Sequence, residues 1–300
     1  MDSQPGARQP IMAARNKHLL AFFSRSLNNF QSSSSPFQIL CTLLPHEAQQ
    51  QIDSPRPLPP SQPVPHLTIL DSSFNPPTAA HRDMALSAAT TSPSSPSRIL
   101  LLLAVQNADK APRPAPFELR LCMMEALARE ILLHHHDGTG AGGSVAAVDV
   151  GVTTRPYFHD KARAVRESGF YAGLGDMTFL AGFDTLIRVL NPRYYGGERG
   201  MAEALDPFFG MSKLRVTMRP GGDWGGVEEQ EGYLGGLQGG GFRTEWLGRI
   251  EMVKGSGGSV GVSSSKVREL VSQGKTQDLE SLVGRDVEQF IRAEELYKEG

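Results

Sequence analysis

The residues best placed to do chemistry lie in the segment LDSSFNPPTAAH (70–81), which combines two serines, a rigid turn and a histidine. Ser72 and Ser73 follow a short β-branched run, and Asn-Pro-Pro enforces a turn before Thr78 and His81 open a predicted helix. Free N–H groups and the dipole at a helix N-terminus favour anions, and a histidine there can donate to a phosphate oxygen. The segment therefore predicts a phosphate-binding site, although a histidine met alone in such a place would be read as a surface residue.

A second candidate is the segment VSSSKVREL (262–270), which opens another predicted helix after a glycine-rich stretch. Ser264 and Ser265 can cap the helix or donate to phosphate, and Arg268 supplies a planar donor one turn later. An ordinary serine cap is the alternative for this segment alone. Together with the first segment, it indicates a polyphosphate.

Strands alternate with helices in the elements that must position these residues. The run Arg98–Val105 is apolar throughout, which suits a strand covered on both faces of a parallel sheet. Strands are predicted over 66–70, 98–105, 144–152, 176–182, 213–220 and 249–255, and helices over 79–89, 117–133, 183–190, 262–274 and 286–297. The pattern predicts an α/β fold with a parallel doubly wound sheet and ligands at the carboxyl ends of its strands.

Two segments interrupt this alternation. Residues 1–65 are expected to hold an N-terminal helix and a proline-rich linker, so that a single α/β domain spans 66–300. The N-terminal segment also has the Arg- and Ser-rich, acid-poor composition of a transit peptide, which leaves mitochondrial import open. Residues 221–241 are glycine-rich and are interpreted as a flexible surface loop whose shortening should leave folding largely unharmed.

Composition favours a small-molecule partner. The 300 residues are 39% hydrophobic and carry a formal charge of −2, so composition gives no support for nucleic-acid binding. Cys41 and Cys122 are far apart and have no CxxC spacing, which argues against a disulfide framework or a structural zinc site. The longest apolar run is far shorter than the ~20 residues that span a bilayer, so no membrane association is expected. A cytoplasmic or nuclear location fits these features.

The first segment resembles the G-S-F-N-P-x-[TH]-x-x-H signature of the nicotinamide mononucleotide adenylyltransferases, within the nucleotidyltransferase superfamily. Its Asp-Ser start is similar to the fungal filamentation-promoter branch. The resemblance implies a Rossmann-like fold in which Ser73 and Phe74 lie along the nucleotide while Thr78 and His81 contact ATP phosphates. Ser72 replaces the usual glycine, and its Cβ narrows the approach of backbone to phosphate. The segment VSSSKVREL is similar to the I-S-S-T-x-I-R motif of the same family.

Further residues match the family in chain order. Lys110 and Arg120 resemble its lysine after the second strand and its helix arginine, which implies that Lys110 faces a substrate phosphate. Gly182 and Asp184 resemble its G-x-D, whose carboxylate accepts ribose hydroxyls; taken alone, this aspartate would be interpreted as a helix cap. Tyr195 stands where relatives carry a tryptophan that stacks on the nicotinamide ring.

The implied reaction is attack by the 5′-phosphate of a pyridine mononucleotide on the α-phosphorus of ATP, giving NAD and pyrophosphate without a covalent intermediate. His81, Lys110 and Arg268 would hold the phosphates together with Mg²⁺, bound mainly through ATP itself. Nicotinamide and nicotinate mononucleotide both remain possible acceptors, and neither a protein metal ligand nor an oligomeric state is assigned.

Three alternatives remain open at this point. The chain could be a pantetheine-phosphate or cytidylyl transferase, an ATP hydrolase of the same fold, or a nucleotide-binding protein without turnover. The Phe-Asn-Pro sequence favours the pyridine branch, and intact His81 and Arg268 favour catalysis.

Overall fold

The computed structural model describes residues 8–48, 55–89, 97–105, 115–136, 145–219, 224–237, 242–255 and 261–298. Their strands form one seven-stranded sheet in the order β1-β4-β3-β2-β5-β6-β7. Neighbouring strands are parallel, except that β1 is antiparallel to β4. The strands are β1 (Phe37–Leu43), β2 (His66–Asp71), β3 (Ser97–Ala104), β4 (Val145–Thr153), β5 (Asp176–Gly182), β6 (Ser212–Met218) and β7 (Ile250–Lys254).

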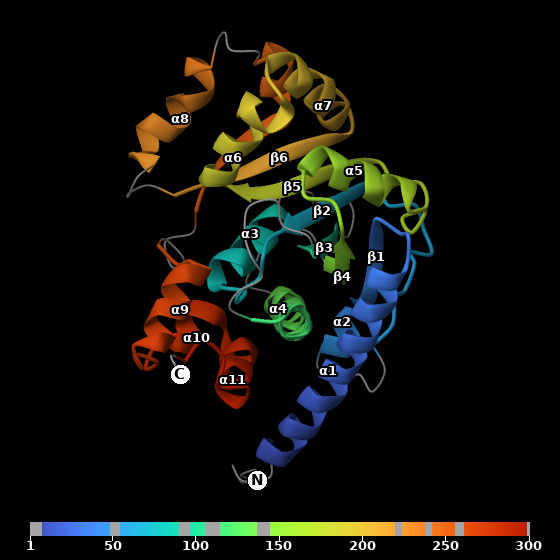
Figure 1. Cartoon of the computed structure of the whole chain (residues 1–300), viewed down its shortest axis with the longest axis vertical. Coiled ribbons are helices and arrows are strands. Elements are labelled where there is room, and N and C mark those ends of the chain that lie inside the picture. Colours follow the sequence, from blue (N-terminus) through green and yellow to red (C-terminus); the bar gives the residue numbers. More distant parts are fainter. Residues whose placement is uncertain are drawn as a thin grey trace.

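Helices cover both faces of this sheet. Figure 1 shows α5, α6 and α7 on one side and α3, α4 and α1 on the other, with α9, α10 and α11 clustered beside α4. The helices are α1 (Arg8–Ser32), α2 (Pro45–Ala48), α3 (Ala79–Ala89), α4 (Phe117–His136), α5 (Phe158–Glu167), α6 (Phe183–Val189), α7 (Glu198–Met211), α8 (Val227–Gly236), α9 (Ser264–Ser272), α10 (Leu279–Val283) and α11 (Arg285–Ala293). Short 3₁₀ turns span Pro192–Tyr195 and Thr244–Arg249.

The apolar run forms the central strand β3 because both faces of this strand are covered by hydrophobic side chains. Successive side chains of a strand point to opposite faces. Ile99 and Leu101 therefore join the hydrophobic cluster shared with α4, whereas Leu100 and Leu102 join the cluster shared with α5 and α7. All four are fully buried. The structure confirms the doubly wound sheet, and because the chain leaves β2 toward β3 on one side and reaches β5 on the other, the strand order reverses between β2 and β5.

The sheet also contains a strand that the sequence did not predict. Strand β1 precedes the proline-rich segment and pairs with β4, so the sheet begins before residue 66, where the α/β domain was predicted to start. The proline-rich segment lies along this edge: the Leu58 N–H donates to Thr42 Oγ1, and Arg98 donates to the Leu58 carbonyl. Prolines are tolerated here because, at the edge of a sheet, no further strand needs the backbone N–H that proline lacks.

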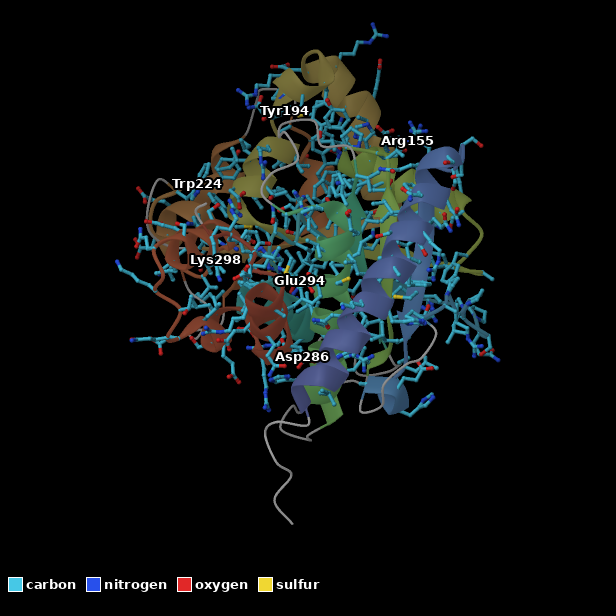
Figure 2. All side chains as sticks on the ribbon, turned by 60° about the horizontal axis from the view of Figure 1, so that its bottom comes forward. Arg155, Tyr194, Trp224, Asp286, Glu294 and Lys298 are labelled. Carbon is cyan, nitrogen blue, oxygen red and sulfur yellow. The ribbon has the colours of Figure 1, made fainter. Side chains whose placement is uncertain are left out.

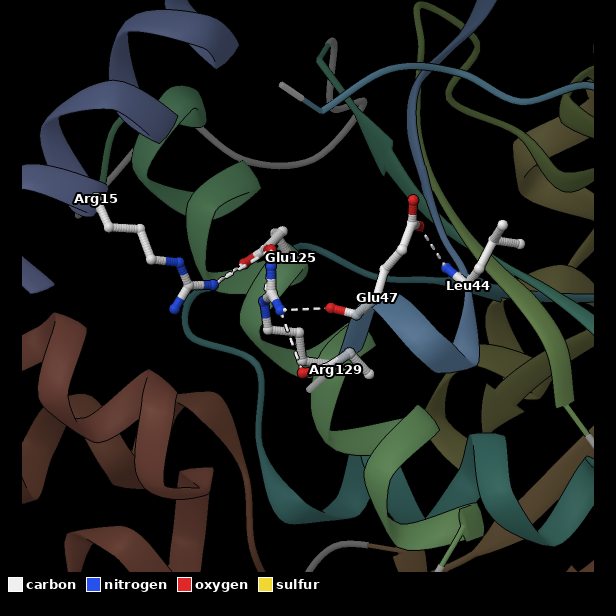
Figure 3. A network of polar contacts seen from close by, with 6 residues as sticks. Arg15, Leu44, Glu47, Glu125 and Arg129 are labelled. Atoms are coloured by element: carbon white, nitrogen blue, oxygen red, sulfur yellow. Dashed lines mark hydrogen bonds and ion pairs between the residues drawn. The ribbon is translucent and has the colours of Figure 1, made fainter. Parts of the chain in front are cut away.

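Helix α1 packs into the core, as an N-terminal helix of the fold should. Phe23 and Phe30 are almost completely buried. In Figure 3, Arg15 of α1 and Arg129 of α4 both bind the carboxylate of Glu125, at 2.9 Å and 2.6 Å. Arg129 also donates to the carbonyl of Glu47 in α2. Because each buried charge has a partner, this network ties three helices together without an unpaired ion.

The glycine-rich segment differs from its prediction. Its described part, residues 224–237, contains helix α8 instead of a flexible loop. The Gly226 N–H donates to the Glu229 carboxylate, which closes the first turn, and Leu234 is buried against the sheet layer. Tyr233 packs edge-on against Phe183 with ring centroids 5.3 Å apart. Composition misled because tertiary contacts can offset the cost of glycine in a helix. No helix within the described ranges is long and apolar enough to cross a bilayer.

Candidate active site

A cavity of about 380 Å³ opens at the carboxyl ends of the central strands. Its lining includes Asp71 at the end of β2, Ala104 at the end of β3, Gly182 at the end of β5 and Arg219 directly after β6. This position is the topological switch point of the sheet, where doubly wound folds bind their ligands. The serines of both predicted segments line the same cavity: Ser72, Ser73, Ser264 and Ser265.

His81 is held in one tautomer at the start of α3. The Thr78 backbone N–H donates to its Nδ1 at 3.1 Å, and Thr78 Oγ1 lies 2.8 Å from the same atom. Since Nδ1 accepts, the ring proton is assigned to Nε2, which lies 2.9 Å from Ser72 Oγ. Burial, followed by the nearby charge of Arg219, lowers the His81 pKa to about 4. His81 is thus a neutral donor at the cavity wall.

The end of β2 is fixed by a buried ion pair. Lys161 of α5 pairs through Nζ with Asp71 Oδ2, and its side chain is only 5% exposed. The ammonium also lies over the Phe158 ring, 5.4 Å from its centroid. The pair anchors the strand end from which Ser72 and Ser73 continue. The sequence did not single out Lys161, because a lysine within an amphipathic helix carries no signal of its own.

The two predicted segments, almost 200 residues apart in the chain, meet in the structure. Ser264 Oγ donates to the Pro76 carbonyl at 2.7 Å, and Arg268 Nη1 donates to the Asn75 carbonyl at 2.7 Å. Arg268 Nη2 also lies 3.1 Å from Ser265 Oγ. Residues of α9 therefore fix the backbone of the Asn-Pro-Pro turn beside the cavity.

The helix cap of α9 differs from the sequence interpretation. Ser263, and neither Ser264 nor Ser265, is the N-cap: its side chain accepts from the Lys266 N–H. An N-cap residue uses its hydroxyl on the helix itself. Ser264 is bound to the turn, and Ser265 contacts Arg268, so each of the three hydroxyls has its own place.

Phe74 forms the floor under the histidine. The side chain is completely buried, its ring centroid lies 5.4 Å from that of His81, and its φ of 44° is in the left-handed region. Such a backbone conformation is costly for a large side chain and persists where the surroundings enforce it. At Phe74, burial of the ring and the bonds from Arg268 and Ser264 to the Asn75 and Pro76 carbonyls hold the backbone in this conformation.

Gly182 and Asp184 lie at the end of β5. Gly182 is the N-cap of α6, and Asp184 lies in the first turn, so the interpretation of this aspartate as a helix cap is wrong. A Cβ at position 182 would stand 2.7 Å from Asp184 Oδ1, so a larger residue there would displace the Asp184 carboxylate from its present position. The Asp184 carboxylate pairs with Arg188 at 3.1 Å on the exposed side of the cavity.

Tyr195 belongs to an aromatic group that the sequence found only in part. Its hydroxyl donates to the Val189 carbonyl at 2.8 Å, and burial raises its pKa. Its ring centroid lies 5.7 Å from that of His159 and 6.5 Å from that of Tyr157. Tyr157 and Tyr195 both line the cavity. Tyr157 and His159 precede or open α5, and only the tertiary fold brings them beside Tyr195.

The remaining predicted cations have different outcomes. Lys110 lies outside the described residues. Arg120 lines the cavity, but its Nε donates to the Ala115 carbonyl and its guanidinium lies over the Phe117 ring. Arg219 lines the cavity as well and was missed by the sequence interpretation. In the part of the chain that the structure describes, no group of three or more His, Cys, Asp or Glu side chains could hold a metal.

Comparison with known proteins complements this geometry. No protein-family model matches the chain. A Schizosaccharomyces pombe protein named "Putative nicotinamide mononucleotide adenylyltransferase" is 32% identical over 234 residues, which cover 77% of this chain and 85% of that protein. Plasmodium falciparum nicotinic acid mononucleotide adenylyltransferase aligns with TM-scores of 0.45 complexed with NaAD and 0.46 complexed with APC, at 12% and 11% identity. Both alignments cover 77% of this chain, and 97% and 96% of the respective structures.

The Schizosaccharomyces pombe relative matches most of both chains. The chain belongs to the nicotinamide mononucleotide adenylyltransferase family.

Proposed function

We propose that this chain transfers the adenylyl group of ATP to nicotinamide or nicotinate mononucleotide. An oxygen of the mononucleotide 5′-phosphate attacks the α-phosphorus, the bond from that phosphorus to the bridging oxygen breaks, and pyrophosphate leaves. With the nicotinamide substrate the product is NAD. The observation that carries the proposal is the neutral His81, whose Nε2–H is held at the wall of a cavity at the switch point.

His81 would serve as a hydrogen-bond donor. In the structure its Nε2–H points at Ser72 Oγ, and a phosphate oxygen in the cavity could replace or share that partner. Because its pKa is lowered to about 4, the imidazole is neutral over the whole neutral pH range, with Nδ1 accepting from the Thr78 N–H and Nε2 carrying the proton. Aimed at oxygens on which charge develops, such a donor lowers the barrier of phosphoryl chemistry.

Arg268 and Lys110 are the other residues proposed to act on phosphates. The Arg268 guanidinium reaches Asn75 with one nitrogen and Ser265 with the other, and it lines the cavity. It would hold the ATP polyphosphate while fixing the turn, with Ser264 and Ser265 alongside. Thr78 is buried and bonded to His81 Nδ1, so it would act on phosphate by orienting that ring. Lys110 is proposed from the sequence alone as a contact of a substrate phosphate.

The nucleosides would occupy the remaining surface of the cavity. The Asp184 carboxylate can accept ribose hydroxyls, and Gly182 leaves room for their approach. Backbone groups of Ser72, Ser73 and Phe74 would lie along the nucleotide. Tyr195 would stack on the pyridine ring, since an aromatic face supplies apolar area to a flat ring.

Mg²⁺ is proposed to enter with ATP. Asp71 and Asp184 are carboxylates that line the cavity, and Asp71 is already paired with Lys161. This donor set fits an ion that is held mainly by substrate phosphates and keeps several waters. When bound, Mg²⁺ would neutralise charge on the leaving pyrophosphate.

Product analysis tests the proposal. The purified chain is incubated with ATP and Mg²⁺ and, separately, with nicotinamide mononucleotide, nicotinate mononucleotide, pantetheine phosphate or no acceptor, and products are separated by liquid chromatography with mass detection. We expect a dinucleotide and equimolar pyrophosphate only with a pyridine mononucleotide. A product with pantetheine phosphate alone, ADP without an acceptor, or bound but unchanged ATP would each replace the proposal with one of the alternatives.

A further inference from the structure

Among the cations of the cavity, Arg219 stands out because its guanidinium has no partner among the residues that the structure describes. Arg188 pairs with Asp184, Lys161 pairs with Asp71, and Arg268 donates to the Asn75 carbonyl. Within the described ranges, by contrast, the guanidinium of Arg219 makes no side-chain hydrogen bond or ion pair. A guanidinium in a partly enclosed site, where water screens charge less, is well suited to bind an anion.

The position of Arg219 shows where such an anion would lie. Its charge is close enough to His81 to lower the pKa of that ring. A Cβ at Gly182 would lie 3.8 Å from Arg219 Nε. Arg219 thus lies near both His81, the proposed phosphate donor, and Gly182, which is close to the carboxylate proposed for the ribose. The group that joins these two places in a bound nucleotide is its phosphate chain.

Helix α8 holds Arg219 in place through its backbone. The side-chain amide of Gln230 is completely buried, accepts from the Arg219 N–H at 3.0 Å and donates to the Arg219 carbonyl at 2.7 Å. The same Nε2 lies 3.3 Å from the carbonyl of Trp224, whose side chain is at the surface (Figure 2). The pair of bonds extends the end of β6 as a further strand would, so the backbone at 219 has a defined direction.

We infer that Arg219 binds the phosphate chain of ATP and that Gln230 is the positioning residue that directs it into the cavity. This inference rests on the proposed function for the identity of the nucleotide. It makes α8, within the glycine-rich segment, a working part of the site. A phosphate contact predicts a loss of affinity that depends on the phosphates of the ligand, whereas a packing role does not.

Titration calorimetry with the full chain tests Arg219. The ligands are adenosine, AMP and α,β-methylene-ATP, and the variants are Arg219→Met, Arg219→Lys and the control Arg199→Met, which removes an arginine that is 93% exposed on α7. We expect Arg219→Met to weaken the ATP analogue by about tenfold to a hundredfold, Arg219→Lys to lie in between, and adenosine to be unaffected. Equal losses for adenosine and the analogue, or no loss at all, would overturn the inference.

Gln230→Met tests the positioning role, because methionine has a similar length and no amide. We expect affinity for the analogue to fall by about three- to tenfold, less than for Arg219→Met, because the Arg219 side chain remains but loses the two backbone bonds that direct it. The double variant Arg219→Met, Gln230→Met should bind the analogue no more weakly than Arg219→Met alone, because both substitutions disrupt the same contact between Arg219 and the phosphates. Leu234→Met is the control: it places methionine at another buried position of α8 without touching Arg219. Additive losses, or a Leu234→Met loss as large as that of Gln230→Met, would mean that Gln230 acts only on stability.

A failure of the inference about Arg219 can be distinguished from a failure of the proposed adenylyl transfer. If the wild-type chain binds the ATP analogue but forms no dinucleotide, the binding pattern still decides the role of Arg219. If it forms the dinucleotide and Arg219→Met binds the analogue normally, the proposed function stands and this inference falls.

Discussion

Two walls of the cavity are built in different ways. The first wall consists of residues 71–81 and 262–268, in which serine, histidine and arginine side chains face the cavity and bind neighbouring backbone. The second wall is formed by Arg219, and helix α8, whose residues do not line the cavity, supports it through the Gln230 amide that bonds to the Arg219 backbone. The residue types and their spacing in the sequence are enough to predict the first wall. The second wall depends on Gln230, which aligns the backbone of Arg219, and no local sequence pattern predicts this contact.

The largest effect should come from the first wall. His81→Ala removes the Nε2 donor, and we expect adenylyl transfer to fall by about a hundred- to a thousandfold, as for other donors that stabilise developing charge. Loss of the bonds to Thr78 and Ser72 should also lower stability by about 1 kcal/mol, far too little to explain such a loss of rate. Steady-state rates of dinucleotide formation, compared with the control His18→Ala at an exposed position of α1, provide the measurement. A near wild-type rate for His81→Ala would remove the proposed phosphate role from this segment.

Replacing residues 224–237 with a short Gly-Ser linker tests the second wall as a whole. Composition alone predicts little harm, whereas the structure predicts that exposing the surroundings of Leu234 and Gln230 costs about 2 to 4 kcal/mol. The melting temperature should drop by about 5 to 10 °C, and affinity for the ATP analogue should fall with it. An unchanged melting curve would show that α8 contributes nothing to the folded state.

A pH-dependent effect concerns the support of the first wall. Glu130 of α4 lies 3.9 Å from Arg82, and a Cβ at Gly284, before α11, would collide with its carboxylate. Burial raises the Glu130 pKa from 4.5 to about 7. Because the folded-state pKa is raised, the stability that this proton contributes is complete below pH 4.5 and is lost as the pH rises through 7.

Glu130→Gln should therefore gain stability relative to wild type by up to about 3 kcal/mol between pH 4 and pH 8. Urea unfolding at several pH values measures the difference. The control Glu203→Gln, at a side chain that is 66% exposed, should show no such trend. Parallel stability curves for wild type and Glu130→Gln would contradict the raised pKa.

Arg268→Lys should have the smallest effect, and it tests the contact between the two segments of the first wall. Lysine keeps the charge but cannot bind Asn75 and Ser265 with two nitrogens, so affinity for the ATP analogue should fall by about tenfold to a hundredfold. The lost bond to Asn75 also predicts a stability loss of about 1 kcal/mol, which the motif alone does not. Calorimetry with the mononucleotide, which should bind almost unchanged, separates the two effects; equal affinities for ATP would leave Arg268 with a structural role only.

The sequence by itself determined the parallel strands β2 to β7 and the residue types of the first wall. The apolar run of β3 has no polar face, so it must be covered by helices on both faces of the sheet. In segment 70–81 the proline rings fix the backbone φ angles, which limits how the serines and the histidine can be placed around the turn. Strand β1 escaped prediction because it lies before a proline-rich segment, and its place depends on pairing with β4 more than one hundred residues later.

Only the tertiary structure decided which side chains share the cavity. The pairs Asp71–Lys161, Arg268–Asn75 and Gln230–Arg219 join separate elements, and in each the partner is set by packing and by the need to satisfy buried polar groups. The helix in the glycine-rich segment arose for the same reason, because burial of Leu234 and the two bonds of Gln230 outweigh a low local propensity. Residue types specify what a site can do, and long-range contacts specify where each group is held.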